Sequence, residues 1–253
     1  MDLITIFNYP KDNQNYTDMC RIWLQCANEF KGSLNVRIFT QDGVNESVEE
    51  LIKKYGFSLE KLSGIKVNNG NSAMANKMNH NIGFKLYNLC KQTEPFVFVD
   101  ADAFILESMD TLVRLSAGKP FVGVNHEKVP NHTAHIPQRF LNSGVQVVND
   151  PSILDFSKIT QMKIVMPGTD QSLLFSYFKF IGYDYTTPGV GFGWNAYAHY
   201  VDIINQDGKW IAKSKLENGH DVHINHYWNP ESKPWNIDCP IYKKYLKDGD
   251  IFV

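Results

Sequence analysis

Two aspartates, Asp100 and Asp102, stand one residue apart in the most apolar part of the chain. Four apolar residues, 96–99, come directly before them, and four more, 103–106, come directly after. Carboxylates are strongly disfavoured in a dry interior unless something pairs with them. The pair therefore marks either a cation site or an ordinary turn, in which one carboxylate caps the backbone and the other is paired or solvated.

The position of the two aspartates allows them to act together. Side chains two residues apart on an extended chain point the same way, and ligands of open α/β sheets lie beyond the carboxyl ends of the strands. Convergent carboxylates repel each other and raise each other's pKa, and a hard divalent ion such as Mg²⁺ or Mn²⁺ resolves that conflict. The spacing alone favours neither interpretation, because D-x-D is a short motif that also arises by chance.

The first part of the chain alternates strand and helix patterns around these aspartates. This order is typical of an α/β fold with a mixed, mostly parallel sheet flanked by helices. Strands of such a sheet are buried on both faces, which explains the unbroken apolar run before Asp100. The pattern predicts strands at 3–7, 34–39, 64–67 and 96–99, and helices at 17–32, 46–56 and 76–90.

The second part of the chain is less regular. The pattern predicts a short helix over 109–118, strands at 120–124 and 140–148, and a helix over 170–182. That last helix would turn Leu173, Leu174, Phe178 and Ile181 inward. The chain has no repeat, low-complexity tract or linker, and we therefore expect a single domain over 1–253.

Composition excludes some classes of partner. The formal charge is −2, with 43% hydrophobic and 21% charged residues, which gives no reason to expect nucleic acid or an anionic membrane. No segment approaches the ~20 apolar residues of a membrane span, and the N-terminus does not resemble a signal peptide. The four cysteines show no CxxC spacing, which favours free thiols. We expect a cytoplasmic protein.

Four sequence blocks follow one another along the chain and are informative when they are taken together. They read "FVFVDADAFIL" (preceded by "FKLYNL"), "FLNSGVQVVNDP", "GTDQSLLFSYF" and "INHYWNPESKPWN". Each block alone is a weak signal, but together they cover roughly residues 65–240. In this order they resemble the GT-A glycosyltransferases, most closely the retaining glycogenin/galactosyltransferase-like group, glycosyltransferase family 8. The resemblance implies a GT-A (Rossmann-like) fold, with a nucleotide-binding half over about 1–106 and a donor-sugar and acceptor half over about 107–253.

The resemblance also implies a metal site and a set of catalytic residues. Asp100 and Asp102 match the motif that holds Mn²⁺, with Mg²⁺ as the alternative, against the diphosphate of a UDP-sugar, and His226 matches the histidine that completes the site. Lys233 matches a lysine that binds the departing diphosphate, although this chain's loop is one residue longer. Asp170 and Gln171 match the pair at a helix start that contacts the transferred sugar.

Donor binding is implied for a larger set of residues. The "NSG" strand would line the donor-sugar pocket, and the end of the first strand would hold the uracil, with either Tyr9 or Tyr16 as the stacking ring. Lys77 has a solvated helix face as its alternative. The residues for which the resemblance implies donor binding are Phe7, Asn8, Tyr9, Tyr16, Lys77, Lys85, Asp100, Ala101, Asn142, Ser143, Gly144 and Lys233.

Two features near the C-terminal end invite other interpretations. His220 and His223 stand close to His226, but on a strand His223 would point away from the other two, which argues against a three-histidine zinc site. The glycine-rich stretch 189–195 does not join a strand to a helix and so fails the context of a dinucleotide fingerprint. We expect it to shape the donor or acceptor pocket, with Trp194 as a platform for a sugar ring.

The function implied by the resemblance is metal-dependent transfer of a hexose from a UDP-sugar to a hydroxyl of a sugar or protein acceptor, with retention of anomeric configuration. Two alternatives are open. Haloacid-dehalogenase-type Mg²⁺-dependent phosphatases also place D-x-D after an apolar strand, although on an early strand, and they give the "HYWNPESKPW" segment no role. A non-catalytic sugar-nucleotide-binding module is the other alternative, and it leaves an intact set of aspartates, histidine and lysine without a purpose.

Overall fold

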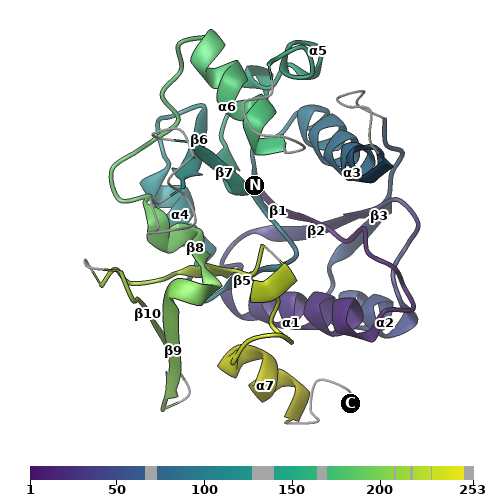
Figure 1. Cartoon of the computed structure of the whole chain (residues 1–253), viewed down its shortest axis with the longest axis vertical. Helices are drawn as coiled ribbons and strands as arrows, with labels where there is room; N and C mark the ends of the chain where they lie inside the picture. The colour runs from purple at the N-terminus through teal and green to yellow at the C-terminus, as the bar shows by residue number, and fades with distance from the viewer. Residues whose placement is uncertain are drawn as a thin grey trace.

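A computed structural model of the chain describes residues 1–65, 73–126, 140–163, 170–207, 209–216, 219–228 and 230–247, with side chains of the third helix described from residue 81. Its centre is a six-stranded sheet in the order β3-β2-β1-β4-β7-β6 (Figure 1). Strands β3, β2, β1 and β4 are parallel to one another, and β7 runs antiparallel to both β4 and β6. The strands are β1 (Asp2–Ile6), β2 (Asn35–Thr40), β3 (Ser58–Lys61), β4 (Phe96–Val99), β6 (Phe121–Asn125) and β7 (Leu141–Val148).

Helices cover both faces of the sheet, as Figure 1 shows. One face carries α1 and α2, and the opposite face carries α3, α5 and α6. Strand β4 serves both layers, because Val97 and Val99 belong to the core under α1 while Phe96 and Phe98 belong to the core under α3 and α6. The helices are α1 (Gln14–Phe30), α2 (Glu46–Lys54), α3 (Ala73–Cys90), α4 (Met109–Leu115), α5 (Phe156–Ile159), α6 (Asp170–Phe180) and α7 (Pro240–Lys247).

A second, three-stranded sheet in the order β5-β11-β8 stands at the carboxyl end of β4. Its strands are β5 (Ala103–Ile105), β11 (Ile224–His226) and β8 (Ala196–Tyr197). A hairpin of β9 (Val201–Gln206) and β10 (Lys209–Ser214) projects from the body (Figure 1). Short 3₁₀ turns occupy Pro151–Ile153, Phe192–Trp194, Ala198–Tyr200 and Pro230–Ser232.

Local sequence explains where the first helix begins and ends. The Asn13 side chain caps α1 by accepting a hydrogen bond from the Tyr16 backbone N–H, 3.4 Å away. The helix stops at Phe30, and Gly32 then adopts a φ of +59°, a left-handed conformation that glycine tolerates best. The predicted stop at the glycine is confirmed.

The predicted fold class is confirmed, with two local corrections. The third strand lies at Ser58–Lys61, whereas residues 64 and 65 are not in a strand and 66–67 lie outside the described residues. It is a half-exposed edge strand with no apolar run, so no period-two pattern marks it. Ile181 is 40% exposed instead of inward, because α6 ends one residue before it.

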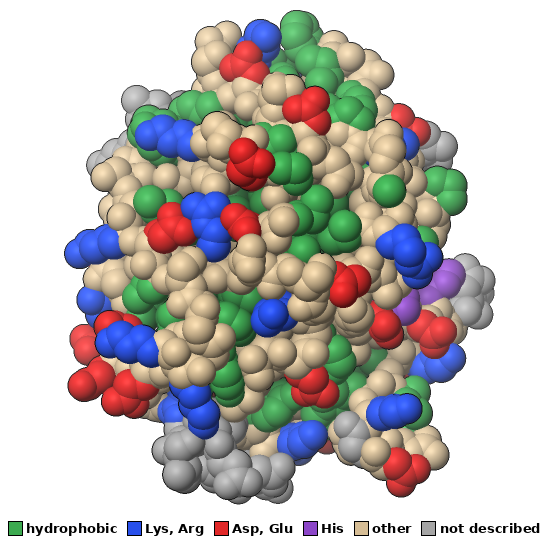
Figure 2. Space-filling model, turned by 180° about the vertical axis from the view of Figure 1, so that it is seen from behind, with side chains coloured by type: hydrophobic (Ala, Val, Ile, Leu, Met, Phe, Trp, Pro, Cys, Tyr) green, Lys and Arg blue, Asp and Glu red, His purple; other side chains and the backbone are tan. Residues whose placement is uncertain are grey.

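The outer surface mixes charges of both signs. Figure 2 shows Lys and Arg side chains interspersed with Asp and Glu on the face seen from behind. Some form exposed ion pairs, such as Lys53 with Glu49 one helical turn apart at 2.8 Å. None of the helices in the described ranges combines the length and the apolar composition that crossing a membrane requires.

Candidate active site

The two aspartates lie where β4 ends and the chain turns into β5. The Asp100 backbone N–H donates to the Gly144 carbonyl on β7, and the Ala103 N–H donates to the Asp100 carbonyl to close the turn. Strand β11 pairs with β5 so that His226 stands opposite Ala103. This pairing brings the histidine next to Asp102, although the two are far apart in the sequence.

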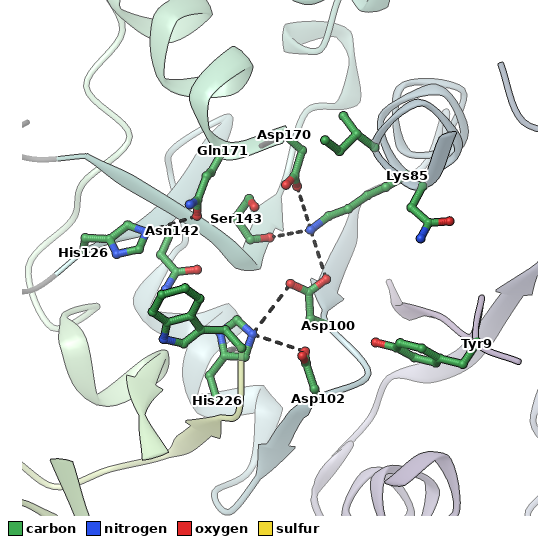
Figure 3. A pocket seen from close by; sticks show the side chains of 13 residues that line it. Tyr9, Lys85, Asp100, Asp102, His126, Asn142, Ser143, Asp170, Gln171 and His226 are labelled. Atoms are coloured by element: carbon green, nitrogen blue, oxygen red, sulfur yellow. Dashed lines mark hydrogen bonds and ion pairs between the residues drawn. The ribbon is translucent and has the colours of Figure 1, made fainter. Parts of the chain in front are cut away.

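Asp100, Asp102 and His226 offer ligand atoms that all lie within 4.8 Å of one another (Figure 3). The His226 Nε2 atom is 3.2 Å from the nearer Asp102 oxygen and 3.9 Å from Asp100 Oδ2. Asp102 and His226 are buried, and the Asp100 side chain is 28% exposed. Two carboxylates and an imidazole on one point form a donor set suited to Mn²⁺.

Asn195 orients the imidazole of His226. Its Oδ1 atom lies 2.8 Å from His226 Nδ1, and both residues are buried. An amide oxygen only accepts, so Nδ1 carries the proton that it receives, and Nε2 is the ring nitrogen that faces the two carboxylates. Such a partner on the second ring nitrogen is typical of a metal-ligating histidine. The three residues therefore fit a divalent cation.

Gly144 leaves room for this arrangement. A Cβ atom at this position would lie 2.4 Å from His226 Cε1 and 3.2 Å from Asp100 Oδ2. The first distance is far inside van der Waals contact, so any larger residue would push the imidazole away. The glycine of the predicted "NSG" strand thus acts through the space it leaves beneath the histidine.

Two buried lysines neutralise the carboxylates. The Lys85 ammonium lies 3.0 Å from Asp100 Oδ1 and 2.8 Å from Asp170 Oδ2, and it donates to the Ser143 carbonyl at 3.0 Å. Lys233 pairs with Asp102 in a buried contact. Three carboxylates and two ammonium groups leave one negative charge in this cluster. A bound divalent cation would make the cluster positive, which suits a diphosphate ligand.

The pKa values follow from burial and these pairs. Burial raises the pKa of Asp100 above its usual range even though Lys85 opposes the rise. Burial would also raise the pKa of Asp102, but Lys233 and His226 outweigh it and hold that pKa well below the usual range. Lys85 likewise outweighs burial at Asp170 and lowers its pKa. The pKa values of Asp100 and Asp102 therefore shift in opposite directions, because Asp102 and Asp170 add negative charge near Asp100 whereas Asp102 has both Lys233 and His226 as partners.

A cavity of about 270 Å³ opens over this cluster. The predicted residues Tyr9, Asn142, Asp170 and Gln171 line it together with Lys85, Ser143 and the three candidate ligands, as Figure 3 shows for the labelled side chains. Asp170 and Gln171 come from the start of α6, and Asn142 and Ser143 come from β7. Lys233, in contrast, pairs with Asp102 but is not among the described lining residues.

The aromatic residues predicted for uracil binding fall into two groups. Tyr9 and Tyr16 stack in parallel with ring centroids 4.6 Å apart, and Trp235 meets Tyr16 edge to face at 5.3 Å. Burial, followed by Asp102 and Asp100, raises the pKa of Tyr9, so the phenol stays protonated. Phe7 is 2% exposed and packs against Trp23, so its ring is not open for stacking.

Two further predicted residues, Asn8 and Ala101, lie away from the cavity lining. Asn8 accepts a hydrogen bond from the Gln41 N–H at 3.0 Å, which joins the ends of β1 and β2. Ala101 is 2% exposed and packs in the core. Lys77 belongs to α3, but its side chain lies outside the described residues.

The structure adds residues that pattern reasoning missed. His126, at the end of β6, lies 3.1 Å from Gln171 Oε1 through its Nε2 atom and lines the cavity. Trp228 also lines it and is 47% exposed, whereas Trp194 is 2% exposed, with its indole against His223. Trp228 is therefore the open indole, and the expectation of Trp194 as an open platform is wrong. The only prior signal for Trp228 was its place in the "HYW" block.

Solved structures of low sequence identity share this fold. The galactosyltransferase LgtC, in complex with donor and acceptor sugar analogs, matches with a TM-score of 0.60 at 14% identity, over 98% of this chain and 94% of its own. The bifunctional glycosyltransferase WbbM matches with a TM-score of 0.61 at 13% identity, over 98% of this chain and 49% of its own. The glycosyltransferase GlyE from Streptococcus pneumoniae matches with a TM-score of 0.59 at 14% identity, over 97% of this chain and 60% of its own.

No protein-family model and no curated protein sequence matches the chain. The structural matches nevertheless place it in a fold class: it has the GT-A fold found in glycosyltransferases, as the four sequence blocks predicted. At this identity the likeness defines the fold alone.

Proposed function

We propose that this protein is a metal-dependent glycosyltransferase that moves a hexose from a UDP-sugar to an acceptor hydroxyl. The observation that carries the proposal is the convergence of Asp100, Asp102 and His226 at the carboxyl end of β4, in a GT-A fold. Retention of anomeric configuration is proposed from the likeness of the sequence blocks to the retaining group.

Each residue of the cluster then has a part in handling charge. Asp100, Asp102 and His226 would hold a divalent cation, which when bound supplies Lewis acidity to the donor's diphosphate. Lys85 and Lys233, which pair with Asp100 and Asp102, would add fixed positive charge beside the site proposed for the diphosphate. The Asp170 carboxylate lines the cavity. With the donor bound there, it would stabilise the positive charge that develops at the anomeric carbon.

The structure lends no support to a phosphatase. The GT-A matches favour sugar transfer as the reaction class.

The proposal is tested by measuring UDP release from a panel of UDP-sugars with and without Mn²⁺. Asp102→Ala and His226→Ala should each abolish Mn²⁺-dependent UDP binding, because each removes one of three ligands, while circular dichroism stays at the wild-type spectrum. Asp202→Ala and His199→Ala, two exposed positions outside the cavity, serve as matched controls. Hydrolysis of phosphate esters without UDP binding or release would refute the proposal, and UDP binding without transfer would identify a binding module.

A further inference from the structure

The Gln171 amide lines the candidate active-site cavity at the start of α6, and its two ends have opposite hydrogen-bonding character. The oxygen end is engaged within the protein, because Gln171 Oε1 lies 3.1 Å from the Nε2 atom of His126, which follows β6 (Figure 3). An amide oxygen only accepts, so His126 Nε2 carries the proton of this hydrogen bond. The contact therefore decides which end of the Gln171 amide remains for a bound ligand.

His126 makes this contact as a neutral imidazole. Burial lowers the pKa of His126 to about 4, although the hydrogen bond to Gln171 acts in the opposite direction. A neutral imidazole has a single N–H group, and the Gln171 oxygen fixes it at Nε2. Near neutral pH, His126 is thus a directional donor that adds no charge to the cavity.

The position of the His126 ring is set by the strands and rings around it. Its backbone N–H donates to the Phe140 carbonyl at 2.7 Å, which continues the pairing of β6 with β7 beyond the ends of the two strands. The ring contacts Phe140 and Tyr197, with ring centroids 5.4 Å away in each case. Phe140 in turn packs at 5.0 Å against Phe175, which lies one helical turn beyond Gln171 on α6. The same packing therefore fixes the imidazole and the helix that carries Gln171 relative to each other.

Asp170, the neighbour of Gln171 at the helix start, has the opposite character. Burial would raise the pKa of Asp170, but Lys85 at 2.8 Å outweighs burial and keeps the carboxylate ionised. An ionised carboxylate only accepts hydrogen bonds. The start of α6 thus offers an acceptor at Asp170 and, with the amide oxygen engaged by His126, a donor at Gln171.

We infer that His126 is a positioning residue for sugar transfer, which holds the Gln171 amide so that its NH₂ group donates a hydrogen bond to an oxygen of the transferred sugar. The inference rests on the proposed function, because it takes this cavity as the site of the donor's sugar. Gln171 then selects an oxygen acceptor on the sugar. Since its own carbonyl oxygen is engaged by His126, the stabilisation of positive charge at the anomeric carbon falls to Asp170.

The orientation of the amide is tested by nitrogen-15 NMR of the full chain with labelled histidine rings. The signals of His126 are assigned by their loss in His126→Gln. At pH 7 the wild type should carry a proton on His126 Nε2 and none on Nδ1. A proton on Nδ1 instead would overturn the inference, because Gln171 would then turn its NH₂ group toward the ring.

Kinetics test whether this contact serves the reaction. UDP release is measured with Mn²⁺ and the best donor among UDP-glucose, UDP-galactose and UDP-N-acetylglucosamine. His126→Phe keeps an aromatic ring but removes the N–H group, so it should lower kcat/KM about tenfold, the effect of one hydrogen bond. The Kd for UDP alone should stay at the wild-type value. His126→Gln keeps an N–H donor and should restore most of the loss, and His199→Phe, at an exposed histidine outside the cavity, is the matched control and should keep the wild-type rate.

A double-mutant cycle tests whether His126 acts through Gln171. In a Gln171→Ala background, His126→Phe should cause no further loss of kcat/KM, because the residue that it positions is gone. The inference is overturned if the two losses multiply, if His126→Gln restores nothing, or if His126→Phe weakens the binding of UDP alone as much as it lowers kcat/KM. A wild type that neither binds nor releases UDP refutes the proposed function and this inference with it. Normal UDP release with a proton on Nδ1, or with multiplied losses, refutes this inference alone.

Discussion

Replacing Lys85 by methionine would remove the ammonium that lies between Asp100 and Asp170 while keeping a side chain of similar length. Lys85 is 9% exposed, and its Nζ atom contacts the two carboxylates at 3.0 and 2.8 Å, the Ser143 carbonyl at 3.0 Å, and the face of Phe98 at 4.4 Å from the ring centroid. The substitution leaves both buried carboxylates without their main cation.

The expected loss of stability is large for a single substitution. Removing one partner of a buried ion pair destabilises proteins by about 3–5 kcal/mol, against a total free energy of unfolding of about 5–15 kcal/mol. The loss should depend on pH. Lys85 lowers the pKa of Asp170 in the folded protein. This interaction stabilises the wild type at pH values above the unfolded pKa of about 3.9, and the stabilisation is lost as the pH falls through the lower pKa of the folded protein. In the variant, burial would raise that pKa instead, so stability should fall as pH rises.

Urea unfolding followed by tryptophan fluorescence, at about pH 5 and about pH 7.5, measures both effects. The difference between Lys85→Met and wild type should be greater at the higher pH. Lys53→Met is the control, because Lys53 forms an exposed pair with Glu49 and its side chain is 72% exposed. The control should change little at either pH. If Lys85→Met were no less stable than Lys53→Met, or if its deficit grew on acidification, the view of Lys85 as the central counter-ion would be wrong.

Two further substitutions probe the support of the metal site. Gly144→Ala should displace His226, because the new Cβ atom would lie 2.4 Å from the imidazole ring. Calorimetry should then show that Mn²⁺-dependent UDP binding is lost, while the circular dichroism spectrum stays unchanged. Binding at the wild-type level would mean that the ring does not need this space. Asn195→Ala removes the acceptor at 2.8 Å from His226 Nδ1 and should weaken Mn²⁺ binding by about 10–100-fold, measured by titration in the presence of UDP. An unchanged Mn²⁺ affinity would show that the imidazole is oriented by its packing alone.

Much of the fold was predictable because its central strands are buried on both faces. The run 96–99 is apolar throughout, and the acids that follow stand out against it. The edge strand β3 was missed because its side chains are polar and partly exposed, so burial imposes no pattern on it. Asp100, Asp102 and His226 were predicted together, and the described geometry brings their ligand atoms within 4.8 Å.

The supporting residues of the site were harder to predict. Asn195 follows a short 3₁₀ turn, and His126 follows the edge strand β6, so neither position has a periodic pattern around it. Their roles depend on contacts with His226 and Gln171, which are distant in the chain. The exposure of Trp228 and the burial of Trp194 likewise depend on tertiary packing, which composition does not report.

The small sheet β5-β11-β8 has a consequence for the order in which the protein matures during synthesis. Strand β5 is translated long before β11, its hydrogen-bonding partner in the small sheet. The apolar residues Ala103–Ile105 therefore have no β11 to pair with until Ile224–His226 have been synthesised. An unpaired apolar strand is a template for association with other chains. Premature termination before Ile224 should therefore yield aggregation-prone fragments, and the cation-binding set becomes complete only when the last part of the chain docks.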